Sequence, residues 1–343
     1  MPYSVQLNQP GDRRRFCYYA KKRGILFEIA KPSENYDIVI VTERADLSVW
    51  SRYKKNKAKI VYDFIDSYLA VPRNDLKGML RGLAKFISRE TRYLKLNYWK
   101  AFEEMCQRSD AVICCTDEQR KDILKFCHNV HEILDFHTSV VRSVKEDYSC
   151  GDIFKLVWEG LPDNLGSLYE IKEVLEQLNS RHKIALHIVT DLEFYKYMGK
   201  FFKRRTEILT KRLLDNIHLH RWEEESCSSI ITGCDMALIP IPLNNPLAAG
   251  KPENKLLLFW RMGMPVVVSG TPAYSRAMER CGLPMACRTK SDWLETLEKY
   301  VNDENARRLA GERGRAFCEN QHSEEKILAQ WDEVIKTVSY DKT

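Results

Sequence analysis

Two lysines lie around the predicted start of a helix, where the positive end of the helix dipole disfavours cations. Lys251 and Lys255 flank Pro252, a residue typical of the first helical position, and the apolar run 256–260 predicts a helix body buried on nearly all sides. The dipole costs each cation on the order of 0.3–1 kcal/mol, but the cost reverses if an anion binds to the free N–H groups and the lysines together. Because an apolar strand at 235–241 precedes it, the helix starts where open α/β sheets bind ligands. The pattern predicts a phosphate or diphosphate site, unless both lysines are solvated and the helix merely packs.

Two other candidate phosphate contacts follow neighbouring predicted strands. Gly160 ends the strand 153–160 and would let the backbone approach a phosphate group, although a tight turn explains the glycine equally well. Thr271 follows the strand 264–269 and could donate its hydroxyl proton to a phosphate oxygen.

A nucleobase pocket is the hypothesis for two further residues. Thr190 and Trp222 belong to the ends of the predicted strands 184–191 and 216–222. The Trp222 ring could stack on a base, with a core tryptophan as the simpler alternative.

If the anion site serves a transferase, a second substrate, the acceptor, must also bind. An inverting transferase would activate this acceptor with a carboxylate or a histidine as general base. Asp63 and Asp66 lie at the end of the predicted strand 59–65, and Asp66 is the favoured acceptor-side residue, with a helix cap or a turn as the alternative role. His137 lies near the expected linker and is a second candidate, although a lone histidine is more often structural.

Strand-like and helix-like segments alternate along the whole chain, which predicts an α/β fold. The strands are continuously apolar, as in parallel sheets covered on both faces. A polar stretch at 138–152 indicates a linker, after which the alternation restarts. We therefore predict an N-terminal unit over 1–145 and a C-terminal unit over 150–322. The predicted strands are 3–8, 25–30, 37–42, 59–65, 110–116 and 131–136 in the first unit, and 153–160, 184–191, 216–222, 235–241 and 264–269 in the second.

Composition excludes several protein classes. The 343 residues carry 54 basic and 48 acidic side chains, a net charge of +6 that mildly favours anionic partners. Apolar runs stay far below the ~18 residues that span a bilayer, and the N-terminus lacks secretory features, so we expect a soluble, cytoplasmic protein. The 11 cysteines form no C-x-x-C pair and indicate buried thiols rather than a metal site.

The segment 73–100 contains eight basic and two acidic residues. It predicts a basic amphipathic helix that could lie on an anionic membrane and would suit a lipid-linked acceptor. The alternative is an ordinary packed helix with a solvated basic face. Nothing in this segment or elsewhere matches a nucleic-acid-binding motif, so we expect no nucleic-acid partner. The basic residues at a spacing of four are Lys77, Arg81, Lys85 and Arg89, and the apolar stripe is Leu76, Leu80, Leu83 and Ile87.

The order of these motifs resembles the GT-B glycosyltransferases, in particular the retaining family with glycosyltransferase-4-like domains. The likeness rests on DMALIPI at 235–241, KPENKLL at 251–257 and GMPVVVS at 263–269. It implies two Rossmann-like lobes with a cleft between them, the second binding a nucleotide-sugar. It also implies that the last helix, with residues 323–343, crosses back onto the first lobe.

The sequence departs from that family at its donor site. Relatives carry two glutamates eight positions apart, where this chain has Gly250 and Leu258, and they place an Arg and a Lys where it has Leu161–Asn164. The resemblance therefore implies a variant subgroup in which an Asn-Lys-Leu stretch replaces the glutamate motif. The residues that would bind the donor diphosphate are Gly11, Gly160, Lys251, Asn254, Lys255 and Thr271.

We predict a metal-independent glycosyltransferase that uses a UDP- or GDP-linked sugar and no cofactor. The acceptor would be a glycan, a lipid-linked glycan or a small molecule, in polysaccharide or glycoconjugate biosynthesis. The sequence contains no D-x-D motif of the kind that binds metal in the other main glycosyltransferase fold. Two alternatives stay open: a non-catalytic scaffold that binds nucleotide or glycan, and a nucleotide-sugar epimerase.

Overall fold

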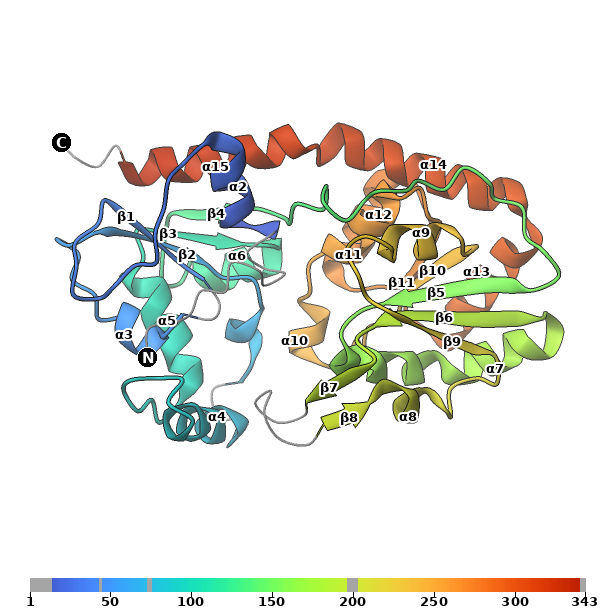
Figure 1. Cartoon of the computed structure of the whole chain (residues 1–343), viewed down its shortest axis with the longest axis horizontal. Coiled ribbons are helices and arrows are strands. Elements are labelled where there is room, and N and C mark those ends of the chain that lie inside the picture. The colour runs from blue at the N-terminus through green and yellow to red at the C-terminus, as the bar shows by residue number, and fades with distance from the viewer. Residues whose placement is uncertain (1–13, 43–44, 73–75, 196–202, 340–343) are drawn as a thin grey trace. The chain divides into compact units, whose positions relative to one another are not determined.

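The computed structural model describes residues 14–42, 45–72, 76–195 and 203–339 (Figure 1). The chain divides into two compact units. The first holds the chain as far as Phe136, the short segment Gly250–Pro252 and the C-terminal residues from Glu324. The second holds residues 137–249 and 253–323. The predicted strands at 37–42, 59–65 and 110–116 all form, and so do those of the second unit.

The first unit is built on a parallel sheet with the strand order β1-β2-β3-β4. Figure 1 shows α2 and α15 along one side of this sheet and α3 and α5 along the other. This cover on both faces explains why its strands are apolar without alternation. Its elements are α2 (Phe16–Arg23), β1 (Ile38–Val41), α3 (Leu47–Trp50), β2 (Lys59–Asp63), η1 (Tyr68–Ala70), α4 (Leu76–Ile87), α5 (Tyr98–Arg108), β3 (Ala111–Cys114), α6 (Asp117–Ile123), β4 (Val130–Glu132) and α15 (Glu324–Ser339).

The second unit is built on a parallel sheet with the order β12-β11-β10-β5-β6-β9. The carboxyl ends of all these strands therefore meet at one edge. Its elements are β5 (Phe154–Glu159), η2 (Pro162–Ile171), α7 (Lys172–Arg181), β6 (Ile184–Thr190), β7 (Glu193–Tyr195), β8 (Lys203–Arg205), α8 (Thr206–Thr210), β9 (Ile217–Arg221), α9 (Cys227–Thr232), β10 (Met236–Ile239), α10 (Pro246–Ala249), α11 (Asn254–Arg261), β11 (Val266–Ser269), α12 (Pro272–Cys281), β12 (Ala286–Cys287), α13 (Lys290–Asn302) and α14 (Glu304–Gln321).

The stretch predicted as a linker packs against the second unit. The Lys145 N–H donates to the Met262 carbonyl at 2.8 Å, and the Tyr148 hydroxyl donates to the Gly263 carbonyl at 2.8 Å. The buried Arg307 guanidinium donates to the Tyr148 carbonyl at 2.8 Å. This polar segment is thus held by the turn that joins α11 to β11 and by the Arg307 side chain of α14.

Residues 25–30, predicted as a strand, form none. Gly24 ends α2 in the left-handed conformation with φ of 64°, and the Ile25 N–H donates back to the Ala20 carbonyl at 2.9 Å. This turn leads the chain to the surface, where Leu26 is 98% exposed. The predicted strand at 3–8 lies outside the described residues.

The C-terminal helix α15 packs on the sheet of the first unit, as expected. Its buried face includes Trp331 and Val334, which join Val61 and Ile113 of β2 and β3 in one apolar cluster. The Trp331 ring stacks on Tyr19 of α2 at 5.5 Å between centroids. The helical layer on this side of the sheet therefore joins residues more than 300 positions apart in the sequence.

We expect Trp331→Ala to lower the free energy of unfolding of the first unit by about 3–5 kcal/mol, since it empties a buried aromatic site. Urea unfolding followed by circular dichroism measures the loss, with separate transitions allowed for the two units. The control is Lys336→Ala on the exposed face of α15, expected to change stability by at most about 0.5 kcal/mol. A Trp331 variant as stable as the control would contradict this packing.

Candidate functional site

The predicted donor-site residues of the second unit gather at the carboxyl edge of its sheet. Gly160 follows β5, Thr190 ends β6 and Trp222 follows β9. Asn254 is the first residue of α11, which follows β10, and Thr271 follows β11. Parallel pairing brings these five positions, far apart in sequence, to one side of the unit.

Lys255 reaches from the first turn of α11 to the end of β5. Its ammonium group donates to the Glu159 carbonyl and lies 3.5 Å from the Glu159 carboxylate. It also lies 5.3 Å from the centroid of the Trp158 ring. The protein thus supplies its own anion to the cation at this helix start, which explains why the unfavourable dipole position is tolerated.

Helix α11 begins two residues later than predicted, at Asn254 with Glu253 as its cap residue. Pro252 precedes the helix and belongs to the first unit, together with Lys251. The acidic cap residue suits the positive end of the helix dipole.

Gly160 has a steric reason to be glycine. A Cβ atom there would lie 2.8 Å from Lys255 Nζ and 3.0 Å from the Trp158 ring. The Gly160 N–H donates to the Val189 carbonyl at 3.2 Å, which holds the turn beside the end of β6. A side chain at this position would push the ammonium group away from the strand end.

The Lys255–Glu159 pair lies against buried groups. The pKa of the Cys227 thiol is raised to about 12, mainly by burial and also by the Glu159 carboxylate, while Lys255 opposes the shift. Burial also raises the pKa of the Tyr274 phenol, with Glu253 and Glu159 adding to the shift. The pair therefore lies at a boundary between the apolar interior and the sheet edge.

Thr190 and Trp222 are neighbours. The Trp222 N–H donates to the Thr190 carbonyl at 3.0 Å, and the Trp222 side chain is half-buried. The Thr190 hydroxyl is buried and has no hydrogen-bond partner among the residues that the structure describes. An orphaned buried hydroxyl at this edge is a polar group that a ligand could satisfy.

Thr271 serves as a helix cap. Its hydroxyl oxygen accepts the Tyr274 N–H at 3.4 Å at the start of α12, and its side chain is fully buried. Capping leaves the hydroxyl proton as the only group that it could offer to a phosphate.

The two candidate carboxylates of the first unit have different surroundings. Asp63 is buried and paired with the buried Arg15, whose Nε lies 3.1 Å from Asp63 Oδ2. Asp66 is half-buried, and its carboxylate accepts no hydrogen bond within the described ranges. Asp63 is therefore structural, and Asp66 is the carboxylate that remains available.

His137 is the first residue of the second unit and is buried. Its carbonyl accepts the Val140 N–H at 3.0 Å, so its backbone forms a turn.

Lys251 lies in the short segment beside Gly250, whose carbonyl accepts a hydrogen bond from Ser67 Oγ at 2.8 Å. Gly11 lies outside the described residues.

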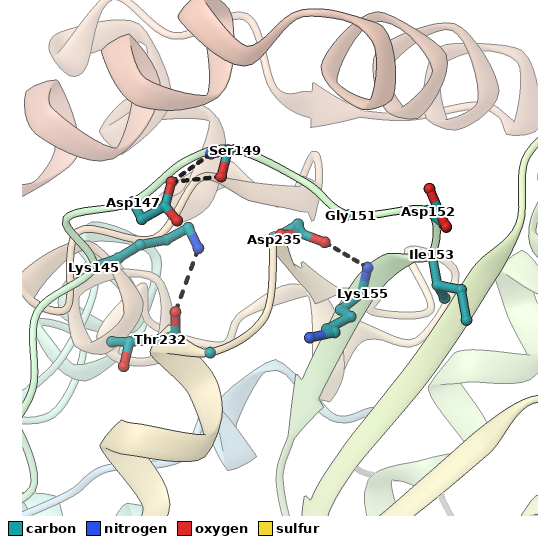
Figure 2. Close-up of a pocket in the computed structure, with 10 residues that line it drawn as sticks. Lys145, Asp147, Ser149, Gly151, Asp152, Ile153, Lys155, Thr232 and Asp235 are labelled. Carbon is teal, nitrogen blue, oxygen red and sulfur yellow. Dashed lines mark hydrogen bonds between the residues drawn. The ribbon is translucent and has the colours of Figure 1, made fainter.

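A hollow of about 560 Å³ opens at the opposite, amino-terminal edge of the second sheet (Figure 2). Its charged groups have internal partners: Lys145 donates to the Cys234 carbonyl at 2.8 Å, and Asp235 accepts the Lys155 N–H at 2.7 Å. Burial lowers the pKa of Lys145 and raises that of Asp235. None of the predicted site residues lines this hollow.

Two other kinds of site are absent from the described part of the chain. No group of three or more His, Cys, Asp or Glu residues there is arranged to hold a metal ion. No helix there is both long and apolar enough to cross a membrane.

Solved structures share the two-unit architecture. S. aureus TarM, in a variant solved with fondaparinux, α-GlcNAc-glycerol and UDP, matches 92% of this chain with a TM-score of 0.60 at 14% identity. Sucrose-phosphate synthase from Thermosynechococcus elongatus matches 94% with a TM-score of 0.60 at 13% identity. The fold is GT-B. A UDP-forming α,α-trehalose-phosphate synthase from Burkholderia xenovorans also matches, over 95% of this chain with a TM-score of 0.56 at 12% identity.

The GT-B likeness is one of structure, and the expected fold class is confirmed by it. No family model matches the sequence, and no curated protein matches it. The chain spans 57% of the TarM chain, 76% of the sucrose-phosphate synthase chain and 78% of the trehalose-phosphate synthase chain.

Sequence reasoning missed the partner of Lys255. Glu159 and Trp158 are 96 and 97 positions away along the chain, so no local spacing connects them to the lysine. The only available signal was the sequence Trp-Glu-Gly at the end of the predicted strand 153–160. That strand was expected to lie beside the strand 235–241, which precedes the helix of Lys255.

The burial of Cys227 behind the ion pair predicts its reactivity. We expect a thiol reagent at about pH 8 to modify the exposed Cys150 rapidly and to leave Cys227 unmodified in the folded protein, because a thiol with a pKa of about 12 stays protonated. Mass spectrometry of the labelled protein identifies the sites. Cys150→Ser should remove the rapid phase, and rapid labelling of Cys227 would contradict the described packing.

Proposed function

We propose that this protein is a GT-B glycosyltransferase that moves a sugar from a nucleotide-diphosphate donor to a glycan, lipid-linked or small-molecule acceptor. The observation that carries the proposal is the placement of the Lys255 ammonium group beside the Gly160 turn and the first turn of α11. A helix start, a glycine turn and a cation are the groups that bind the oxygen atoms of a diphosphate. Such a reaction belongs to polysaccharide or glycoconjugate biosynthesis.

In the proposed reaction the diphosphate replaces Glu159 as the partner of Lys255. The bond between the anomeric carbon and the diphosphate oxygen breaks, and the acceptor oxygen takes the sugar. Negative charge grows on the leaving diphosphate, so a cation held in place lowers the barrier most when it faces those oxygens. We propose Gly11, Lys251, Asn254 and Thr271 as further donor contacts, and Thr190 and Trp222 as the nucleobase pocket.

The acceptor side is proposed on the chemistry of two residues. Asp66 is a half-buried carboxylate, and His137 is a buried imidazole. Either could take the acceptor proton if the reaction inverts configuration. We propose no metal and no cofactor for the reaction, with UDP- and GDP-sugars as the first donors to test.

We also propose peripheral contact with an anionic membrane through residues 73–100, which would bring the enzyme to a lipid-linked acceptor. The eight basic residues of this segment support the contact.

Incubation with radiolabelled UDP- and GDP-sugars tests the transfer reaction. We expect slow donor hydrolysis with one nucleotide series, because water can replace the missing acceptor. Tight nucleotide binding without turnover of any donor would favour the alternative of a non-catalytic scaffold. Conversion of the donor into its epimer without release of the nucleotide would favour an epimerase.

We expect Lys255→Ala to weaken UDP or GDP binding roughly tenfold or more, because a charge-assisted contact to the diphosphate is lost. Binding of the corresponding nucleoside should change less than about twofold, since it has no phosphate. Isothermal titration calorimetry measures both. The control is Lys299→Ala, an exposed lysine near the end of α13. Equal losses for nucleotide and nucleoside would refute the assigned role.

Glu159→Gln tests whether the diphosphate competes with Glu159 for Lys255. Removal of the competing carboxylate should tighten nucleotide binding, because Lys255 is released and a repulsive charge is lost. Weaker binding in this variant would mean that Glu159 positions the lysine rather than competes for it.

A further inference from the structure

Helix α4 has its polarity reversed relative to an ordinary surface helix. Its inner face carries Gly78 and Gly82, which lie against α5 and the loop before it. A Cβ atom on Gly78 would lie 2.2 Å from Trp99 Nε1, and one on Gly82 would lie 2.0 Å from the Lys95 carbonyl oxygen. Only a helix without side chains at these positions can approach so closely.

Arg81 and Lys85 of α4 contact groups within the first unit. The Arg81 guanidinium lies 5.0 Å from the centroid of the Tyr68 ring and 5.6 Å from that of Trp99. The Lys85 ammonium lies 2.9 Å from the Glu90 carboxylate. Both side chains are half-buried, whereas Arg89, the next basic residue at this spacing, is exposed.

Leu80, Leu83 and Ile87 of α4 face outward instead. Leu80 is 67% exposed and Ile87 is 71% exposed, and Leu83 lies between them on the same face of the helix. Phe86, which lies beside Leu83 and Ile87 on the helix, is also exposed. We call the following set the α4 apolar surface: Leu80, Leu83, Phe86 and Ile87.

An excess of positive charge accompanies this surface. Residues 80–96 hold five basic side chains and one acidic side chain, a net charge of +4. Arg89 and Arg92 are exposed, and Arg89 has a left-handed backbone with φ of 59°. A second copy of the same surface would bring the exposed Arg89 and Arg92 of both copies together, which disfavours self-association. An anionic lipid surface satisfies both features, since it accepts apolar side chains and attracts the cations.

We infer that the α4 apolar surface inserts into the headgroup region of an anionic membrane, with Arg89 and Arg92 contacting lipid phosphates. The inference specifies the residues of the membrane contact proposed above. It does not depend on sugar transfer, because vesicle binding is measured without donor or acceptor.

Flotation of the full chain with phosphatidylcholine vesicles, with and without phosphatidylglycerol, tests the inference. We expect binding to the anionic vesicles only, and weaker binding as the salt concentration rises. The double variant Leu80→Glu/Ile87→Glu should lose roughly tenfold or more of that binding. Both side chains are exposed, so circular dichroism and the thermal midpoint should stay unchanged. The control is Ile208→Glu, a 65% exposed residue of α8 in the second unit, which should bind as the unaltered protein does.

Three outcomes would overturn the inference. They are no binding of the unaltered protein to anionic vesicles, equal binding of the double variant, and a dimer in solution that the double variant converts to monomer. The last would assign the surface to a second copy of the chain. Loss of vesicle binding with intact donor hydrolysis, or the reverse, separates this inference from the proposed reaction.

Discussion

The contact of Lys255 with the end of β5 is the interaction on which the candidate site depends. It fixes the first turn of α11 against the sheet edge, requires glycine at position 160 and places the ammonium group over the Trp158 ring. Because Glu159 already compensates the charge of Lys255, the proposed diphosphate would have to displace the Glu159 carboxylate. Lys255 would thus be held in position before the diphosphate binds, which lowers the entropic cost of ordering its side chain. The loss of the contact with Glu159 would reduce the net binding free energy.

The strands were the most predictable part of the fold. Short apolar runs bounded by turn residues, such as 59–65 and 235–241, formed strands because a parallel sheet needs both faces apolar. Residues 25–30 have the same composition and form none, because the turn at Gly24 directs the chain to the surface. Composition gives the tendency of a segment, but only a neighbouring strand turns it into part of a sheet.

The amphipathic pattern of α4 was evident in the sequence, but its direction was not. Periodicity shows that Leu80, Leu83 and Ile87 share a face, and says nothing about whether that face is inside. The direction is set by Gly78 and Gly82, whose missing side chains admit the backbone and rings of the neighbouring chain. Aromatic partners for Arg81 then hold this basic residue half-buried on the same side as the glycines. Both facts need residues 10 to 20 positions away or more, so a helical wheel alone cannot provide them.

Each unit has a carboxylate at the end of a central strand paired with a cation. The two pairs differ in their exposure to solvent. In the first unit the Asp63 and Arg15 side chains are 1% and 3% exposed, and Arg15 has a second carboxylate in Asp135 at 3.2 Å. In the second unit the Glu159 and Lys255 side chains are 15% and 26% exposed, and Glu159 is the only carboxylate paired with Lys255 in the described part of the chain. Opening the first pair would leave buried charges uncompensated, which costs more than a surface anion returns. Opening the second exposes one carboxylate to water and frees one cation at a helix start. The same arrangement of charges therefore holds the first unit together, whereas in the second unit it leaves a pair that the proposed diphosphate could open.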